Sequence, residues 1–477
     1  MNLWAVRCSA ALCALACVGS ASGKDLLGVY QDALRFDTQI QQAQATYKAA
    51  REAAPEAWAA LLPQLSGNYA LSRQKQDEST VFPLPGSGGS VQPFSQNTRE
   101  YINTHGYQLQ LTETLFSWQN LATLAQAHKK VAQAEATFKA AQEDLVQRVA
   151  TAYFNVLDAK DTLDANEASL DADTRQLEQT RKRYQVGLIP LTNVQQTQAA
   201  HDAAAAAVIA AKRNLASMQG LLREITERDY SMLAKPGDAM PLKVPQPADP
   251  QRWVSASMNQ NLALISSRLA ADAARDQVRI AFGGHLPTIA ITGTRTDTHE
   301  NIDEQFSFGG TPGRLRYPEE LTDGEIGIQV TVPIFSGGLV HAQVHQAQFE
   351  WIAAKDNLET VSRQTEYQAR DAYNGVVSEV AQVAALKQGV ESAETALKAT
   401  EAGYKIGTQT ELNVLEERQA LVAAQTSYAT ARYGYILDTI QLQLAAGTLD
   451  EHTLAQINSW LTVRQTLSTS PVLEPLR

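Results

Sequence analysis

"RYQVGLIPLTNVQQTQ" (Arg183–Gln198) returns in the same layout as "GYKIGTQTELNVLEERQ" (Gly403–Gln419). Equivalent positions are 220 residues apart in every case: Tyr184 and Tyr404, Gly187 and Gly407, Asn193 and Asn413, Val194 and Val414. Glycine readily ends a helix, and both stretches follow long segments without proline. The repeated stretch therefore predicts two helical hairpins in an internally duplicated chain.

The duplication extends well beyond these two turns. The stretch "LFSWQNLATLAQAHKKVAQAEATFKAA" (Leu115–Ala141) corresponds in layout to "IFSGGLVHAQVHQAQFEWIAAKDNL" (Ile334–Leu358). Similarly, "LLPQLSGNYALSRQ" (Leu61–Gln74) corresponds to "HLPTIAITGTRTDT" (His285–Thr298). Each half therefore predicts a helix, two strands and a long helical hairpin. The proline-rich stretch Lys235–Pro250 separates the halves, because proline interrupts helices.

These correspondences set the expected boundaries. The first repeat covers residues 24–234, with strands at about 62–76 and 102–116 and a hairpin at 118–228. The second covers residues 251–452, with strands at about 286–298 and 324–335 and a hairpin at 339–446. Residues 1–23 are expected to form a signal peptide, 235–250 a linker and 453–477 a C-terminal tail.

The predicted strands alternate apolar and polar residues, which is typical of a strand with one apolar face. Soluble sheets and the strands of membrane barrels both show this pattern, so alternation alone leaves both open. The positions expected to share a face are Tyr107, Leu109, Leu111, Glu113 and Leu115 in one strand, and Ile326, Ile328, Val330, Val332 and Ile334 in another.

The hairpin segments are unusually long for helices. Residues 118–184 contain neither proline nor glycine and would span about 100 Å as one continuous helix. Leu163, Leu170, Leu177 and Tyr184 recur every seven residues, as in a coiled coil. A soluble periplasmic coiled-coil structural protein is therefore the alternative interpretation, but it does not account for the four strands.

The first 23 residues resemble a secretory signal peptide cleaved near Gly23, with Arg7 ahead of an apolar stretch. A lipoprotein signal ending at Cys17 is the alternative. All three cysteines lie in this segment, so the mature chain is expected to have no disulfide or thiol metal site. Of the 40 Lys and Arg residues, 39 remain after Arg7 is removed, against 51 acidic ones. A net charge of −12 argues against nucleic acid as a partner.

Four strands cannot close a barrel, and open sheet edges in lipid leave backbone groups unpaired. If the strands lie in a membrane, several chains must share one barrel. The paired strands, the two turns, "GHLPTI", "VPIFSGG" and "TARYGYILDTIQLQLAAGTLDEHTL" together resemble the TolC family of outer-membrane efflux and type I secretion channels over almost the whole mature chain.

The resemblance implies an α+β membrane protein. Three copies would share a twelve-stranded antiparallel β-barrel in the outer membrane of a Gram-negative cell. A long α-helical barrel would continue into the periplasm. The homotrimer would be the exit duct of a multidrug efflux pump or a type I secretion system. Its implied partners are outer-membrane lipid, a periplasmic adaptor (membrane fusion) protein and an inner-membrane transporter of the RND or ABC type.

The same resemblance assigns roles at the hairpin ends, the periplasmic mouth of the duct. Where family members often have Asp and Arg in the gate, this chain has Asn193 and Gln409, so its mouth is expected to be held less tightly or by other groups. The implied periplasmic gate residues are Gln176, Tyr184, Thr192, Asn193, Glu401, Tyr404 and Gln409. The implied pore constriction is Asn413 and Glu416, and the implied adaptor contacts are Val186, Gly187, Leu188, Ile406, Gly407 and Thr408.

No enzyme motif accompanies these features. His341 and His345 are four residues apart, but no glutamate follows the first histidine as in a zinc-protease helix. The glycine-rich stretches lack P-loop spacing, and no Gly-x-Ser-x-Gly elbow is present. We therefore expect no catalytic residues, no bound metal and no cofactor.

Overall fold

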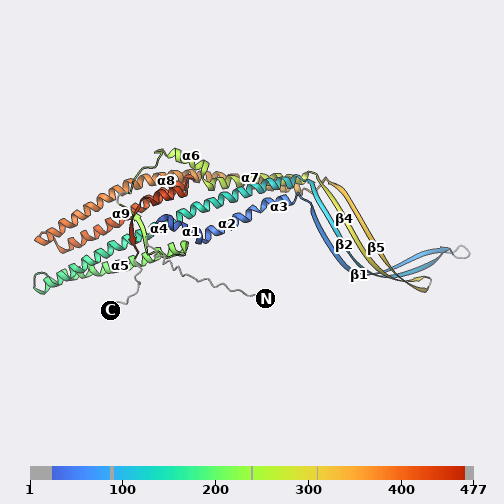
Figure 1. Cartoon of the computed structure of the whole chain (residues 1–477), viewed down its shortest axis with the longest axis horizontal. Helices are drawn as coiled ribbons and strands as arrows, with labels where there is room; N and C mark the ends of the chain where they lie inside the picture. The colour runs from blue at the N-terminus through green and yellow to red at the C-terminus, as the bar shows by residue number, and fades with distance from the viewer. Residues whose placement is uncertain (1–23, 86–90, 238–239, 309, 468–477) are drawn as a thin grey trace, which may run out of the picture. The chain divides into compact units, whose positions relative to one another are not determined.

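The computed structural model describes residues 24–85, 91–237, 240–308 and 310–467 (Figure 1). The predicted signal peptide, with Cys17 and Gly23, lies outside the described residues. The chain forms two compact units. The helical unit contains the chain up to Ala45, residues 136–265 and the chain from Thr360 onward, while the sheet unit contains residues 46–135 and 266–359. Each unit therefore combines equivalent parts of both halves.

The sheet unit is built on four antiparallel strands in the order β1-β2-β4-β5. Their bounds are Gln64–Pro85 for β1, Val91–Phe116 for β2, Thr288–Phe308 for β4 and Thr311–Thr331 for β5. Each half contributes one hairpin, and β2 pairs with β4 from Gln96↔Phe308 onward to join the halves.

The predicted strand ends were wrong, because the strands continue through segments expected to be loops. The β1–β2 register runs unbroken from Gln64↔Thr112 to Pro85↔Val91, and the β4–β5 register from Thr288↔Thr331 to Phe308↔Thr311. These outer parts carry many charged residues, prolines and glycines among scattered apolar ones, so they lack the regular alternation that marked the inner parts as strands. At the other end of β5, pairing stops at Thr331 rather than at the predicted residue 335.

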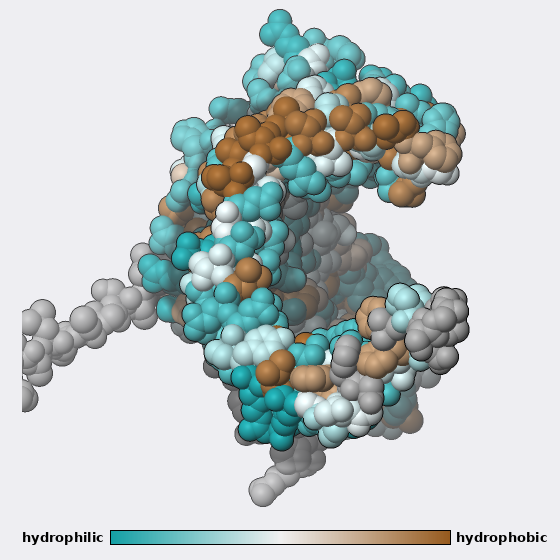
Figure 2. Space-filling model, turned by 90° about the vertical axis from the view of Figure 1, so that its right-hand side faces the viewer, coloured by the Kyte–Doolittle hydropathy of each residue, from teal (hydrophilic) through white to brown (hydrophobic). Residues whose placement is uncertain are grey.

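The two apolar stretches predicted from alternation lie on one face of the sheet, apart from Leu115 at an irregularity of β2 and Val332 and Ile334 beyond the end of β5. Leu111 pairs with Gly293, and Gly293 pairs with Ile326, so these positions share a face. Figure 2 views this end of the molecule and shows hydrophobic residues gathered in a band. We call this set the apolar band: Leu65, Tyr69 and Leu71 on β1, Tyr107, Leu109 and Leu111 on β2, Ile289 and Ile291 on β4, and Ile326, Ile328 and Val330 on β5.

Short helices precede the strands in both halves. In the first half these are α2 (Thr38–Arg51) and α3 (Ala53–Ala59). In the second half these are α7 (Leu262–Phe282) and the 3₁₀ turn Gly283–His285. In the sheet unit, the amide of Gln126 donates to the Ala273 carbonyl at 2.9 Å, which ties α7 to the helix that follows β2.

The two hairpins have equal dimensions. Helices α4 (Trp118–Gln185) and α8 (Leu339–Ile406) each have 68 residues, and α5 (Leu191–Thr226) and α9 (Glu411–Ala446) each have 36. Their ends in the helical unit are the hairpin turns (Figure 1). In the described part of the chain, none of the helices combines the length and apolar character that crossing a membrane requires.

The core of the helical unit lies along α4 and α9. Tyr153 and Phe154 of α4 are fully buried, and the Phe154 ring stacks on Tyr433 of α9 with centroids 5.8 Å apart. The Tyr153 hydroxyl donates to the Ala234 carbonyl at 2.5 Å. Three further helices belong to this unit: α1 (Leu26–Phe36), α6 (Pro250–Gln260) and α10 (Glu451–Asn458).

A second, small sheet was not predicted. Strand β3 (Met232–Pro236) pairs antiparallel with β6 (Leu461–Thr466). The first overlaps the expected linker, and the second lies in what the sequence suggested was a tail. With five and six residues, these strands are too short for alternation to be recognised, and they are defined by pairing across the chain.

Candidate functional site at the hairpin ends

The two hairpin turns have the same backbone structure. Gly187 and Gly407 have φ angles of +76° and +85°, in the left-handed region that favours glycine. The amide of Leu188 donates to the Arg183 carbonyl at 3.0 Å, and the amide of Thr408 donates to Gly403 at 2.9 Å. This six-to-one bond defines the Schellman motif, which satisfies the last carbonyls of a helix. The two copies of the repeated sequence thus end their helices in the same way.

Glu411 joins the two hairpins. It is the first residue of α9, after the N-cap Thr410, and only 2% of it is exposed. Its carboxylate accepts hydrogen bonds from Gln176 Nε2 at 2.7 Å, from Asn193 Nδ2 at 3.3 Å and from the Thr180 hydroxyl. All three donors belong to the first hairpin. These donors and the N-terminus of α9 offset the cost of burying the charge.

A second link lies about two helical turns along α9. Arg418 donates to the Asp173 carboxylate of α4 at 2.5 Å, and both side chains are nearly buried. A longer contact of 3.5 Å reaches Glu401 of α8. Arg418 therefore connects α9 with both long helices. A buried pair of this kind is costly to break from one side, because the remaining charge loses its partner.

The third link involves Arg183 and Tyr404, which stand near the ends of α4 and α8. Arg183 Nη1 donates to the Tyr404 hydroxyl at 2.9 Å, and its guanidinium lies over the tyrosine ring, 5.4 Å from the centroid. Burial raises the pKa of Tyr404, and the nearby Glu411 charge raises it further. Tyr404 thus stays a neutral hydroxyl at physiological pH.

The structure brings only part of the predicted gate together. Gln176, Asn193, Glu401 and Tyr404 all take part in the three links. Tyr184 and Thr192 are exposed, and within the described residues neither makes a side-chain hydrogen bond.

The predicted constriction residues lie on α9. The Asn413 amide donates to Gln409 at 2.6 Å, a contact within the second turn rather than between hairpins. Asn413 is half-buried and Glu416 is exposed. The predicted adaptor-contact residues are exposed at the turns, and Val186, Leu188 and Ile406 keep 69%, 69% and 78% of their surface accessible.

Five residues of the three links were not anticipated from the sequence: Glu411, Arg418, Asp173, Thr180 and Arg183. One signal was present for Glu411, since an acidic residue after a threonine N-cap is typical of a helix start. Nothing in the sequence shows that its carboxylate turns inward to the other hairpin. The pairing of Asp173 with Arg418 joins positions 245 residues apart and requires the tertiary fold.

Long paired helices and a sheet with an apolar band are features expected of a membrane channel with an extended helical part. The chain belongs to the outer membrane efflux protein family, whose model matches residues 29–226 and 253–448. The two matched segments correspond to the two halves of the duplication, and the predicted family resemblance is confirmed.

Individual relatives agree with this assignment. The chain is 32% identical over 453 residues to outer membrane protein TolC of Escherichia coli (strain K12), covering 94% of this chain and 87% of that protein. It is 26% identical to the proteases secretion protein PrtF of Dickeya chrysanthemi over 453 residues, covering 93% and 92% of the two chains. The outer membrane channel CmeC of Campylobacter jejuni shares the fold, with a TM-score of 0.70 at 19% identity and coverage of 91% and 89%.

The chain is therefore an outer-membrane protein that acts as an exit duct in efflux or type I secretion, with its helical part in the periplasm. The predicted function and localisation are confirmed. The alternative of a soluble coiled-coil protein is not favoured, because these relatives are outer-membrane channels or secretion proteins.

Proposed function

We propose that three copies of this chain assemble into one channel, with a barrel of twelve strands and a tube of twelve long helices. The observation that carries this proposal is the amphipathic four-stranded sheet whose edge strands, β1 and β5, have no outer partner within the described chain. Unpaired backbone groups at such edges cost several kcal/mol each in lipid. Pairing β1 of one copy with β5 of the next removes both edges.

The dimensions of the apolar band support a position in the bilayer. From Leu65 to Leu71 the band extends about 20 Å along β1, which covers most of the ~9–11 residues that a tilted strand needs to cross a bilayer. On β2 it covers Tyr107 to Leu111, and on β5 Ile326 to Val330. The polar face carries Gln, Thr and Glu side chains, as expected for a water-filled interior.

The hairpin ends form the periplasmic mouth in this assembly. The Glu411 carboxylate and the Asp173–Arg418 pair hold the two hairpins of each chain together and favour the closed mouth. These charges substitute for those that family members often have at the positions of Asn193 and Gln409. Opening requires the two hairpins to separate, which exposes Glu411 and breaks its hydrogen bonds.

Ion selection in this assembly depends on α9. Three copies of the exposed Glu416 would form an acidic ring, while three copies of Asn413 would form a neutral one. Carboxylate rings in a narrow pore favour cations. We therefore expect moderate cation preference, set by Glu416.

The exposed apolar residues at the turns fit a docking role. Val186, Leu188 and Ile406 stand beyond the last helical contacts, where a periplasmic adaptor would meet the mouth. Through this adaptor the channel would work with an inner-membrane transporter of the RND or ABC type. Similarity to TolC and to the protease secretion protein PrtF supports both drug efflux and protein secretion as uses of the duct.

Reconstitution into planar lipid bilayers tests the proposal. The purified protein is first sized as a detergent complex and then added to one side of the bilayer. A trimer with discrete, cation-preferring conductance steps is expected. A stable monomer or dimer that still conducts would contradict the shared twelve-stranded barrel.

A further inference from the structure

The charged residues of the sheet are sorted by face. All six Lys and Arg residues of β1, β2, β4 and β5 lie on the face that carries the apolar band: Arg73, Lys75, Arg99, Arg295, Arg314 and Arg316. We call these six residues the basic band. The opposite face carries no Lys or Arg in these strands but seven acidic residues: Glu78, Glu100, Glu300, Glu304, Glu319, Asp323 and Glu325.

On β1 and β4 a basic residue follows the last apolar-band residue of the strand, and Arg295 stands level with Leu109 of the apolar band, its partner on β2. On β1, Arg73 is the next residue on this face after Leu71, and on β4 Arg295 is the first charged residue beyond Ile291. The sheet therefore changes from apolar to basic within one or two residue pairs along these strands. Both arginines are exposed, which leaves their guanidinium groups accessible.

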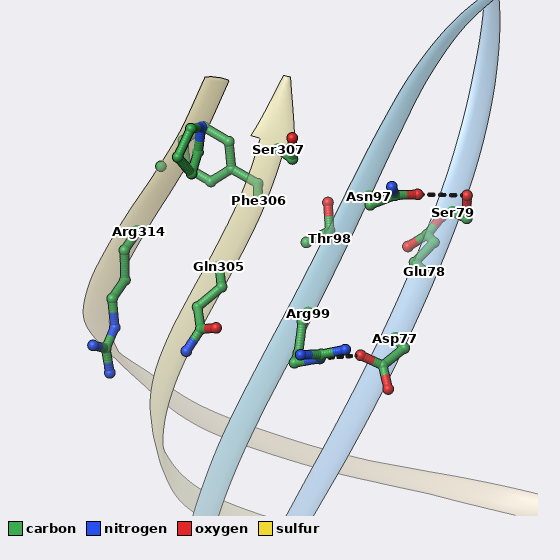
Figure 3. Close-up of a pocket in the computed structure, with 12 residues that line it drawn as sticks. Asp77, Glu78, Ser79, Asn97, Thr98, Arg99, Gln305, Phe306, Ser307 and Arg314 are labelled. Carbon is green, nitrogen blue, oxygen red and sulfur yellow. Dashed lines mark hydrogen bonds and ion pairs between the residues drawn. The ribbon is translucent and has the colours of Figure 1, made fainter. Parts of the chain in front are cut away.

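Among the described residues, Arg73 and Arg295 have no acidic partner, whereas the other four basic side chains of the basic band have one. Lys75 and Arg99 both contact Asp77, and Figure 3 shows the Asp77–Arg99 pair bridging β1 and β2. Arg314 and Arg316 share Asp303 in the same way.

Asp297 and Glu320, two further acids of this face, contact His299 at 3.3 Å and 3.6 Å. Neither forms an ion pair with Arg73 or Arg295 among the described residues. Glu113 lies between Leu111 and the end of β2 that leads into α4. In the described chain, Arg73 and Arg295 form no ion pair, and Arg73 only stacks over the Tyr101 ring at 6.0 Å.

We propose that the basic band binds the phosphate groups of lipid headgroups in the membrane leaflet farther from the helices. This inference rests on the proposed position of the apolar band in the bilayer. Arginine side chains bind phosphate through paired N–H donors, and cations next to a membrane surface attract anionic lipid. Arg73 and Arg295 are the principal ligands, because their charges are not already compensated.

The sorting of charge supports a lipid headgroup rather than a free anion as the ligand. The acidic face would repel anionic lipid, so only the face with the apolar band can adjoin it. The change from apolar to basic side chains follows the order of acyl chain and phosphate in a leaflet. A site for soluble anions would not require its cations to adjoin an apolar band.

The test measures lipid retention by the full-length protein. The detergent-purified oligomer is incubated with lipid A carrying two phosphates or with enzymatically dephosphorylated lipid A, and bound lipid is counted by native mass spectrometry. Wild-type protein is expected to bind the phosphorylated form preferentially. The double variant Arg73→Gln/Arg295→Gln is expected to bind it roughly tenfold more weakly.

Two controls separate charge from other causes. Arg213→Gln removes one arginine charge at an exposed position on α5 and should leave lipid A binding unchanged. Arg73→Lys/Arg295→Lys keeps both charges and should bind within a few-fold of wild type. Equal retention of both lipid forms by wild type, or full displacement of lipid A by millimolar inorganic phosphate, would overturn the proposal.

Flotation with phosphatidylcholine vesicles distinguishes this inference from the proposed function. A protein that floats with the vesicles but does not prefer phosphorylated lipid A lacks the headgroup site while keeping its membrane position. A protein that does not float contradicts both the membrane position of the apolar band and the headgroup site.

Discussion

The carboxylate of Glu411 accepts a hydrogen bond from the side-chain amide of Gln176 at 2.7 Å, across the space between α9 and α4. Asn193 and Thr180 complete its set of donors, so one buried charge links both hairpins of the same chain. Charge-assisted hydrogen bonds contribute about 1.5–3 kcal/mol each. In the proposed trimer, this contact would hold the mouth closed within each chain, besides any contact between chains.

Glu411→Gln is expected to favour the open mouth. Glutamine keeps the shape of the side chain, but its NH₂ group cannot accept from the donors that face Glu411. We expect the closed state to lose about 2 kcal/mol per chain, which is roughly a thirtyfold shift toward separated hairpins for each chain of the channel. Single-channel recording in planar bilayers measures this shift. Glu178→Gln, on the exposed side of α4, is the matched control, and an equal rise in both variants would contradict the role of Glu411.

The Asp173–Arg418 pair predicts a non-additive pattern of stability. Asp173→Asn leaves Arg418 buried without a full countercharge and is expected to destabilise the helical unit by about 3–5 kcal/mol. The combined replacement Asp173→Leu/Arg418→Met removes both charges and is expected to cost much less. Thermal unfolding followed by circular dichroism gives the order. If the double variant unfolds at a lower temperature than Asp173→Asn, the prediction is wrong. The Asp173–Arg418 pair then stabilises the helical unit by more than the cancelling of two buried charges.

The repeated turns predict equal costs of substitution at equivalent positions. Alanine at Gly187 or Gly407 meets no atom within 4 Å, so only the positive φ angle opposes it. Each change is expected to destabilise its hairpin by about 1 kcal/mol. Gly220 lies inside α5, also without a neighbour within 4 Å, and alanine there should stabilise by about 0.5–1 kcal/mol. Losses at all three positions would point to a packing cause instead.

The helical hairpins could be predicted from the sequence because the signals for them are local. The ends of the long helices are marked by Gly187 and Gly407 with their neighbours. The long segments without proline mark the helices themselves. The inner strand pairs were also visible, since Leu109 and Ile328 belong to clear alternating runs. Where apolar residues no longer alternate regularly with polar ones, as around Glu100, the local pattern does not separate strand from loop.

The predicted site was incomplete for a different reason. Asn193 and Tyr404 were recognised because they stand at positions that the family resemblance marks. Glu411 and Arg418 depend on side-chain partners more than 200 residues away, and family positions do not indicate them. At Asn193 and Gln409 this chain lacks the charges that family members often have. The charges of Glu411 and Arg418, which we propose take their place, become apparent only in the tertiary structure.

Glu143 predicts a pH dependence of stability. It lies half-buried on α4 beside Tyr30 and Leu449, and burial raises its pKa from 4.5 to about 7. Because the folded-state pKa is the higher one, its contribution to stability is full below pH 4.5 and is lost as pH rises through 7.

Glu143→Gln should remove this loss, so that the variant exceeds wild type by about 1–2 kcal/mol at pH 8 and equals it near pH 4.5. Denaturant unfolding across this pH range measures the difference. The exposed Glu224→Gln serves as control and should follow the wild-type profile. Parallel profiles for Glu143→Gln and wild type would show that burial does not penalise this carboxylate.

Glu416 predicts the ion preference of the open channel. In the proposed trimer it supplies three carboxylates at the constriction, while Asn413 supplies none, so its removal leaves that part of the pore without fixed negative charge. Glu416→Gln is therefore expected to abolish most of the preference for potassium over chloride, and Asn413→Asp to strengthen it. Reversal potentials in a salt gradient measure both changes. If Glu416→Gln leaves the reversal potential unchanged while Asn413→Asp shifts it, the Glu416 side chain lies away from the ion path. Cation preference then arises elsewhere, and the acidic face of the sheet is the alternative source.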